Sequence, residues 1–415
     1  MVVCVDACGS SGSVSEKLAR PARAISQGTH VIAPTRRGRS EESLPHNPAM
    51  LIPSTRLCGT HHRLANSLWR CAYSTQKTSP PLRILFAGSD EFSAVSLRAL
   101  HKEQQENPEL IASLDVLCRE DGKTGRKRNI LKEVPIKPLA TSLSLPLHII
   151  PSFLNWSLPR DYDLIIAVSF GLFIPSSIIT SLPYGGLNVH PSLLPRYRGA
   201  APIQRTLLNN DPLAGVTIQT LDTQKFDHGK ILLQREIPVP DDVRYGAFHD
   251  YLAASGAEML VEVLRKRLFV APIQEVGGGY EPSLAKKVGT EDEHVDWTSW
   301  GSREARLRCE MLGSLWTELG GKRTILQGVE VLGELPEEGG FTGSATRGEL
   351  ELLSEGEFRW VKITGGEEKG REIMVVRMRD GWVTVGSVKV EGKKEQLGGD
   401  WVRSMQGRGV GKRFV

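Results

Sequence analysis

A continuous apolar run from Asp163 to Ser169 constrains the fold of this chain more than any other segment. Its centre, Leu-Ile-Ile-Ala-Val, lacks the polar alternation of a strand that has one face in water. Such runs are typical of strands buried on both faces of a parallel sheet. An apolar strand at 83–88 leads into an amphipathic helix at 90–102, which together form a βα unit. The sequence therefore predicts an α/β fold of the Rossmann-like kind, built on a parallel sheet.

Length and composition favour two domains and argue against several classes of protein. The chain has 415 residues, of which 40% are hydrophobic and 24% charged, as in ordinary globular proteins. No segment approaches the roughly 18 apolar residues of a membrane helix. Only Cys118 and Cys309 follow residue 80, without a CxxC pattern, and the turn after 83–88 lacks GxGxxG. We therefore expect no metal, no NAD or FAD and no membrane contact.

Two polar side chains share one face of an otherwise apolar strand that begins at Gly186. Residues two apart in a strand point the same way, so Asn188 and His190 project together. Pro191 has no N–H and ends the strand, leaving both residues at its carboxyl end, where open α/β sheets bind ligands. An amide and an imidazole can both donate hydrogen bonds to an oxygen that gains charge when a carbonyl is attacked. The pair is a candidate oxyanion site, and simple capping of a buried strand is the alternative.

A proton acceptor for such a reaction must come from elsewhere in the chain. Asp227 is the best candidate among the downstream carboxylates, because it lies in a loop between apolar strands at 216–221 and 231–239. We expect the ends of the strands to bring this loop beside Asn188 and His190.

These residues belong to a longer pattern that resembles the folate-dependent formyltransferases. The pattern comprises Asn188-x-His190, Ser192-Leu-Leu-Pro195, the run from Arg196 to Gln204, Gly215-Val-Thr-Ile218 and Asp227-x-Gly229. Its spacing follows that family over about forty residues, and most closely the members that act on methionyl-tRNA. Lys225 and His228 depart from the family, which favours small residues at both positions.

The resemblance implies transfer of the formyl group of 10-formyltetrahydrofolate to the α-amine of initiator methionyl-tRNA. Asn188 and His190 would stabilise the oxyanion, Asp227 would accept a proton, and a monomer without metal would suffice. Two alternatives stay open: a formyltransferase acting on an amino sugar or a purine precursor, and a non-catalytic folate- or RNA-binding protein. The Arg-Gly-Ala-Ala-Pro-Ile-Gln run and a C-terminal β domain count against the first alternative. The presence of all three catalytic residues counts against the second.

The resemblance also assigns contacts to the two substrates. The expected folate-binding residues are Phe170, Gly171, Leu172, Ser192, Leu193, Leu194 and Pro195, with core packing as the alternative for the aromatic side chain. The expected tRNA-binding residues come from a basic, glycine-containing loop and from the segment after the strand, and are Arg126, Lys127, Arg128, Arg196 and Arg198. A solvated surface is the alternative for these charges.

Residues 1–80 have the composition of an extension rather than of a folded domain. No Asp or Glu occurs from Met50 to Ser89, whereas arginines are spread among Ser, Leu and Ala. This composition predicts a disordered segment with a mitochondrial transit peptide, and hence a protein of the mitochondrial matrix. Four acidic residues interrupt the first 49 positions, so a translation start at Met50 is one possibility. A disordered tail without a targeting role is the alternative.

The rest of the chain divides into a formyltransferase domain at 81–270, a linker at 271–298 and a small domain at 299–415. A helix is expected at 303–312, and short strands at 324–332, 358–363, 373–378 and 382–390. Strands at such spacing are typical of a small β-barrel, here OB-like by resemblance. The resemblance assigns tRNA binding to this domain, whose basic residues concentrate near the C-terminus: Lys393, Lys394, Arg403, Arg408, Lys412 and Arg413.

Overall fold

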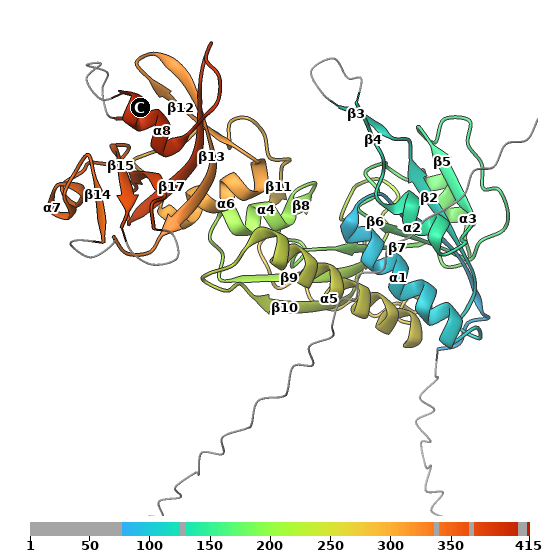
Figure 1. Cartoon of the computed structure of the whole chain (residues 1–415). Helices are drawn as coiled ribbons and strands as arrows, with labels where there is room; N and C mark the ends of the chain where they lie inside the picture. The colour runs from blue at the N-terminus through green and yellow to red at the C-terminus, as the bar shows by residue number, and fades with distance from the viewer. Residues whose placement is uncertain (1–76, 125–129, 336–339, 365–368, 406–412) are drawn as a thin grey trace, which may run out of the picture. The chain divides into compact units, whose positions relative to one another are not determined.

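The structure is a computed structural model that describes residues 77–124, 130–335, 340–364, 369–405 and 413–415 (Figure 1). The predicted transit peptide falls almost entirely outside these residues. The basic side chains Arg126, Lys127 and Arg128 also lie outside them, between the short strands β3 (Gly122–Thr124) and β4 (Ile130–Lys132).

The first domain is built on one seven-stranded sheet with the order β10-β9-β7-β6-β1-β2-β5 (Figure 1). Its strands are β1 (Leu82–Gly88), β2 (Ile111–Arg119), β5 (Leu147–Ile150), β6 (Leu164–Val168), β7 (Gly186–His190), β9 (Leu213–Thr220) and β10 (Ile231–Pro238). Five neighbouring strands of the sheet are parallel to one another: β7, β6, β1, β2 and β5. Strand β9 runs antiparallel to β7, and β10 runs antiparallel to β9. The predicted Rossmann-like α/β domain is confirmed, with an antiparallel edge that the sequence did not indicate.

Alternate residues of the central strands point into two separate hydrophobic cores, one on each face of the sheet. Ile84 and Phe86 of β1 pack on one face with α1 (Glu91–Glu106) and α5 (Tyr245–Arg265). Leu85 and Ala87 pack on the other face with α3 (Ser176–Ser181). Two further short helices, α2 (Ile136–Ser142) and α4 (Pro202–Leu208), complete the layers. Burial on both faces explains why β6 is apolar throughout.

One ion pair joins the start of β1 to the residue before β6. Asp163 accepts hydrogen bonds from the backbone N and Nε of Arg83 at 2.8 and 2.9 Å, and from its Nη2 at 2.8 Å. These bonds with the Arg83 side chain hold the pKa of the Asp163 carboxyl below its usual range. The pair fixes the two adjacent strands at the end of the sheet opposite the ligand-binding edge.

The predicted linker forms a short strand against the first domain. Its strand β11 (Leu284–Ala285) pairs in parallel with β8 (Arg198–Gly199). The connection between domains therefore includes a β contact with the segment that follows β7.

The second domain is rich in antiparallel strands, as predicted. Its strands are β12 (Leu315–Leu319), β13 (Lys322–Leu332), β14 (Phe341–Gly343), β15 (Phe358–Ile363), β16 (Glu372–Arg377), β17 (Trp382–Val390) and β18 (Gln396–Leu397). They follow the order β12-β13-β17-β16-β15-β14, with β18 on β17, so that β12 and β14 end the path among the described residues. Helices α6 (Ser302–Leu312), α7 (Arg347–Glu351) and α8 (Gly398–Met405) accompany them. Trp297, Trp300 and Trp401 are buried in the core, so these tryptophans are structural.

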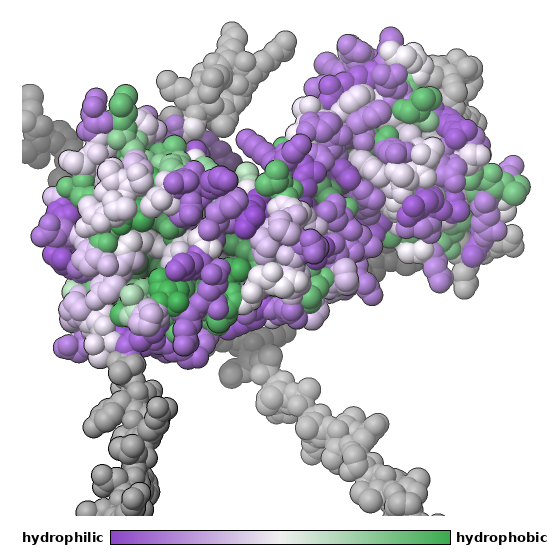
Figure 2. Space-filling view, turned by 180° about the vertical axis from the view of Figure 1, so that it is seen from behind, coloured by the Kyte–Doolittle hydropathy of each residue, from purple (hydrophilic) through white to green (hydrophobic). Residues whose placement is uncertain are grey.

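Hydrophobic residues lie in separate clusters among hydrophilic ones on the face shown in Figure 2. Within the described part of the chain, no helix has both the length and the apolar character needed to cross a membrane.

Candidate active site

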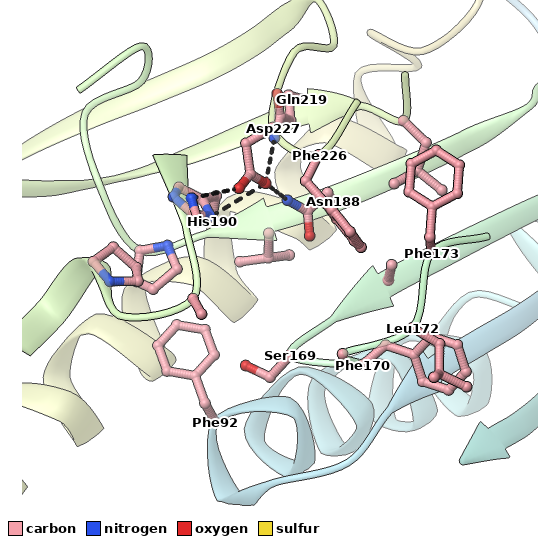
Figure 3. A pocket seen from close by; sticks show the side chains of 18 of the residues that line it. Phe92, Ser169, Phe170, Leu172, Phe173, Asn188, His190, Gln219, Phe226 and Asp227 are labelled. Carbon is pink, nitrogen blue, oxygen red and sulfur yellow. Dashed lines mark hydrogen bonds and ion pairs between the residues drawn. The ribbon is translucent and has the colours of Figure 1, made fainter. Parts of the chain in front are cut away.

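A cavity of about 650 Å³ lies beside β6 and β7 in the first domain (Figure 3). Asn188, His190, Gln219 and Asp227 gather on one side of it, while Phe170, Leu172 and Phe173 lie on another. Phe92 from the start of α1 also faces this space. The cavity therefore brings polar groups and an aromatic wall together.

Strand β7 places two of the polar groups on one face. Leu187 and Val189 point into the core shared with α1 and α5, where 0% and 2% of their surface is exposed. Asn188 and His190 point the other way, and both contact the same carboxylate. The predicted orientation of this pair is confirmed.

The Asp227 carboxylate is surrounded by hydrogen-bond donors. Its Oδ1 lies 3.2 Å from Asn188 Nδ2, 3.3 Å from Gln219 Nε2 and 3.5 Å from His190 Nδ1. Its Oδ2 accepts the backbone N–H of Gly199 at 2.8 Å. Two amide donors and the His190 ring nitrogen lie against Oδ1 and one backbone N–H reaches Oδ2, so Oδ2 has more remaining capacity to accept a proton.

Asp227 reaches this position by a different route from the predicted one. Because β9 is antiparallel to β7, its carboxyl end lies beside the beginning of β7, where Leu221 N donates to Gly186 O at 2.8 Å. Residues 222–230 then fold back over β7. Gly229 permits this fold, since a Cβ there would lie 1.6 Å from the Thr220 carbonyl oxygen. The structure brings Asp227 beside Asn188 and His190 as expected, but through a loop that folds back over β7 and not through adjoining strand ends.

The contact of His190 Nε2 determines which ring nitrogen faces the cavity. Nε2 lies 2.9 Å from the carbonyl oxygen of Tyr197, which can only accept, so Nε2 carries a hydrogen. Only Nδ1 then faces Asp227 and the cavity. For His190 to donate from Nδ1 as well, the ring must carry a hydrogen on both nitrogens.

Gln219 was not predicted from the sequence. It lies directly opposite Asn188 in the β7–β9 pairing, and only 1% of its surface is exposed. Its amide donates to Asp227, while its Oε1 is buried without a hydrogen-bond partner in the described structure. The alternation of Thr217 and Gln219 on an apolar strand, as in Asn188 and His190, was the signal that could have identified it.

The predicted folate residues fall into two groups. Phe170, Gly171 and Leu172 line the cavity, and Gly171 has a φ of 77°. Beside them Phe173 contacts Phe226 edge to face, with ring centroids 5.1 Å apart.

Ser192, Leu193, Leu194 and Pro195 do not line the cavity. The Ser192 hydroxyl donates to Arg196 O at 2.7 Å, and Leu193 packs against Gly215. The side chains of Ser192 and Leu193 are thus used within the loop after β7, and contact of these four residues with the folate stays a prediction.

Arg196 and Arg198, in the same loop after β7, contact neighbouring parts of the domain. Arg196 pairs with Asp211 at 2.5 Å, and Arg198 Nε donates to the backbone carbonyl of Asp227 at 2.8 Å. Both side chains therefore support the site, and their contact with tRNA stays a prediction.

The two departures from the family pattern also have defined positions. Lys225 lines the cavity, and the exposed ring of His228 contacts the backbone oxygen of Phe226, 2.6 Å from Nδ1. His228 therefore does not contact the catalytic groups directly.

Tyr245 contributes a neutral hydroxyl to the cavity wall. Burial raises the pKa of its phenol, and the hydroxyl accepts from Gln204 Nε2 at 2.9 Å. Among the described residues no group of three His, Cys, Asp or Glu side chains could hold a metal ion.

Residues 82–264 match the sequence model of the formyl transferase family. The chain is similar to the mitochondrial methionyl-tRNA formyltransferase of Saccharomyces cerevisiae, with 37% identity over 292 residues that cover 60% of this chain and 73% of the relative. The corresponding mitochondrial protein of Homo sapiens is 30% identical over 340 residues, covering 79% of both chains. A methionyl-tRNA formyltransferase of Ehrlichia chaffeensis is 34% identical over 245 residues, 57% of this chain and 75% of that protein. With an amide, an imidazole and a carboxylate converging on the cavity of the matched domain, this chain belongs to the methionyl-tRNA formyltransferase family.

Proposed function

We propose that this protein transfers the formyl group of 10-formyltetrahydrofolate to the α-amine of initiator methionyl-tRNA. The observation that carries the proposal is the convergence of Asn188, His190 and Asp227 on one wall of the cavity, although Asp227 lies 39 positions from Asn188. The names of the relatives support the choice of acceptor. They also favour this acceptor over an amino sugar or a purine precursor.

The three groups have complementary tasks in acyl transfer. Asn188 uses one amide hydrogen for Asp227, which leaves its second hydrogen for the formyl oxygen as that oxygen becomes negative. His190 adds a second donor from Nδ1 when its ring is charged. Asp227 accepts the proton that the amine loses as its nitrogen bonds to the formyl carbon. The bond from that carbon to N10 of the folate then breaks, and N10 takes up a proton as tetrahydrofolate leaves. Because Asp227 contacts both donors, one carboxylate orients the oxyanion site and serves as the base.

The aromatic wall fits the flat ring of a folate donor. Phe170 is 3% exposed and Ile174 5% exposed, so both present a fixed apolar surface. The positive φ of Gly171 exposes backbone groups that can hydrogen-bond a heterocycle. We assign the donor to the side of the cavity formed by Phe170, Gly171 and Leu172.

The remaining parts of the proposal concern tRNA and location. The β-rich C-terminal domain and the basic segment with Arg126, Lys127 and Arg128 would contact the tRNA backbone, because Lys and Arg neutralise phosphates. The N-terminal composition and the mitochondrial relatives support work in the mitochondrial matrix, in translation initiation. A monomer is the oligomeric state that we propose.

Formyl transfer to purified methionyl-tRNA, measured with the full chain and 10-formyltetrahydrofolate, tests the proposal. Uncharged tRNA, a nucleotide-linked amino sugar and glycinamide ribonucleotide serve as competing acceptors. We expect formylated aminoacyl-tRNA and no product with the other acceptors. Transfer only to a small amine would mean that this amine, and not methionyl-tRNA, is the acceptor. Binding of 10-formyltetrahydrofolate without any transfer would indicate a non-catalytic folate-binding protein.

A further inference from the structure

The linker strand β11 packs against the loop that holds the catalytic groups. Arg198 N donates to Ser283 O at 2.9 Å, and Ala201 N donates to Ala285 O at 3.2 Å. Ser283 N in turn donates to Pro195 O at 3.3 Å. The linker therefore follows the loop from residue 195 to residue 201, although about eighty residues separate the two segments in the sequence.

Tyr197 is the point where this linker contact meets the catalytic histidine. Its backbone N donates to Ser283 Oγ at 2.9 Å, while its carbonyl accepts the Nε2 hydrogen of His190. Its φ is 60°, in the left-handed region that residues other than glycine rarely adopt. Its phenol is held by Asp211 and Asn209. A conformation of this kind persists only when several contacts enforce it, and Ser283 provides the contact on the backbone N–H.

Strand β11 also packs against Gly199, the loop residue that contacts Asp227. Gly199 N donates to Asp227 Oδ2, and its φ is 117°. A Cβ on Gly199 would lie 2.9 Å from Ala285 O. The loop thus gives one backbone bond to His190 and one to Asp227, and the linker packs against it at both points.

We infer that Ser283 is a positioning residue for His190, acting through the backbone of Tyr197. The inference rests on the proposed function, because its consequence for turnover concerns that reaction. Without Ser283 Oγ, the Tyr197 N–H loses its acceptor and the residue can relax out of the left-handed region. Its carbonyl then turns away from Nε2, and His190 loses the contact that directs Nδ1 toward Asp227.

The test compares Ser283→Ala, Ser283→Thr and the control Ser142→Ala in the full chain. Ser142 also loses a hydroxyl bond, to Leu139 O at 2.8 Å in α2. We expect Ser283→Ala to lower kcat about tenfold, the scale of one lost hydrogen bond, with KM for both substrates within about twofold. Ser283→Thr keeps the hydroxyl and restores kcat, and Ser142→Ala leaves kcat unchanged.

A second measurement does not depend on which substrate is correct. In protein labelled with ¹⁵N-histidine, the ring signals of His190 are assigned by their absence from the His190→Gln spectrum. We expect Ser283→Ala, but not Ser142→Ala, to shift the Nε2 signal of His190. Wild-type values of kcat and of the ring signals in Ser283→Ala would overturn the inference, even if its Tm fell. A shifted ring signal in a protein that formylates no tRNA would support the inference while contradicting the proposed function.

Discussion

His190 and Tyr197 are joined by a 2.9 Å hydrogen bond from the ring Nε2 to the backbone carbonyl. This bond commits Nε2, so His190 presents Nδ1 to the Asp227 carboxylate and to the cavity. The His190 ring can therefore help to hold an oxyanion only from Nδ1.

Replacing either oxyanion donor should stop turnover rather than binding. We expect Asn188→Ala or His190→Ala to lower kcat about 10²–10³-fold, because each donor acts mainly when the formyl oxygen becomes negative. The KM for 10-formyltetrahydrofolate should change little in steady-state formyl transfer. Asn107→Ala, which removes an amide 3.4 Å from Glu103 and remote from the cavity, is the control. Near-full activity in either site variant would refute the assignment.

Asp227→Asn tests the proton acceptor while keeping the size of the side chain. The amide is a weaker base and cannot accept from three donors as a carboxylate does, so we expect kcat to fall about 10²-fold or more. Single-turnover formyl transfer measures this step directly. An Asn variant that retained a tenth of the activity would show that another group accepts the proton.

Gln219→Leu tests a residue that supports Asp227 from the neighbouring strand. Its Nε2 bond is one of two amide bonds to Oδ1, so we expect kcat to fall only about fivefold to tenfold. Ile218→Val, which changes the preceding residue of β9 where it is buried in the core on the other face, controls for disturbance of the strand. Equal losses in the two variants would mean that strand packing, rather than the amide, causes the effect.

Gly199→Ala should damage the site more than a matched glycine substitution. Gly199 and Gly278 have φ values of 117° and 85°, and any side chain at such angles costs about 1–3 kcal/mol. Only Gly199 lies against backbone, whereas a Cβ on Gly278 meets nothing within 4 Å. We expect both variants to lose stability in urea unfolding but only Gly199→Ala to lose kcat. Similar kcat values would show that the Gly199 bond to Asp227 has no role in turnover.

The Arg83–Asp163 pair predicts a pH-dependent part of the stability. Because the pKa of Asp163 is lowered in the folded state, its contribution is complete above the unfolded value of about 4. It is lost as the pH falls from there through the folded-state pKa. Asp163→Asn should therefore lower the urea midpoint at pH 7 and much less at pH 2. Asp161→Asn, with a side chain 91% exposed, is the control and should have little effect at either pH.

The sequence by itself determined the local features of this protein. Two-residue periodicity placed Asn188 and His190 on one face of β7, and a fully apolar run indicated that β6 is buried on both faces. The family pattern identified Asp227 as their partner, and the structure joins it to both residues. The predictions for β6 and β7 succeeded because side-chain direction and strand burial follow from residues close together in the chain.

Only the tertiary structure decided how distant segments meet. The antiparallel direction of β9 makes the Asp227 loop fold back, and this places Gln219 opposite Asn188. Ser192 donates to the backbone of Arg196, Arg196 pairs with Asp211, and Ser283 reaches Tyr197 from the linker. Such pairings depend on long-range hydrogen bonds and close packing between segments, which leave no periodic signal in either segment alone.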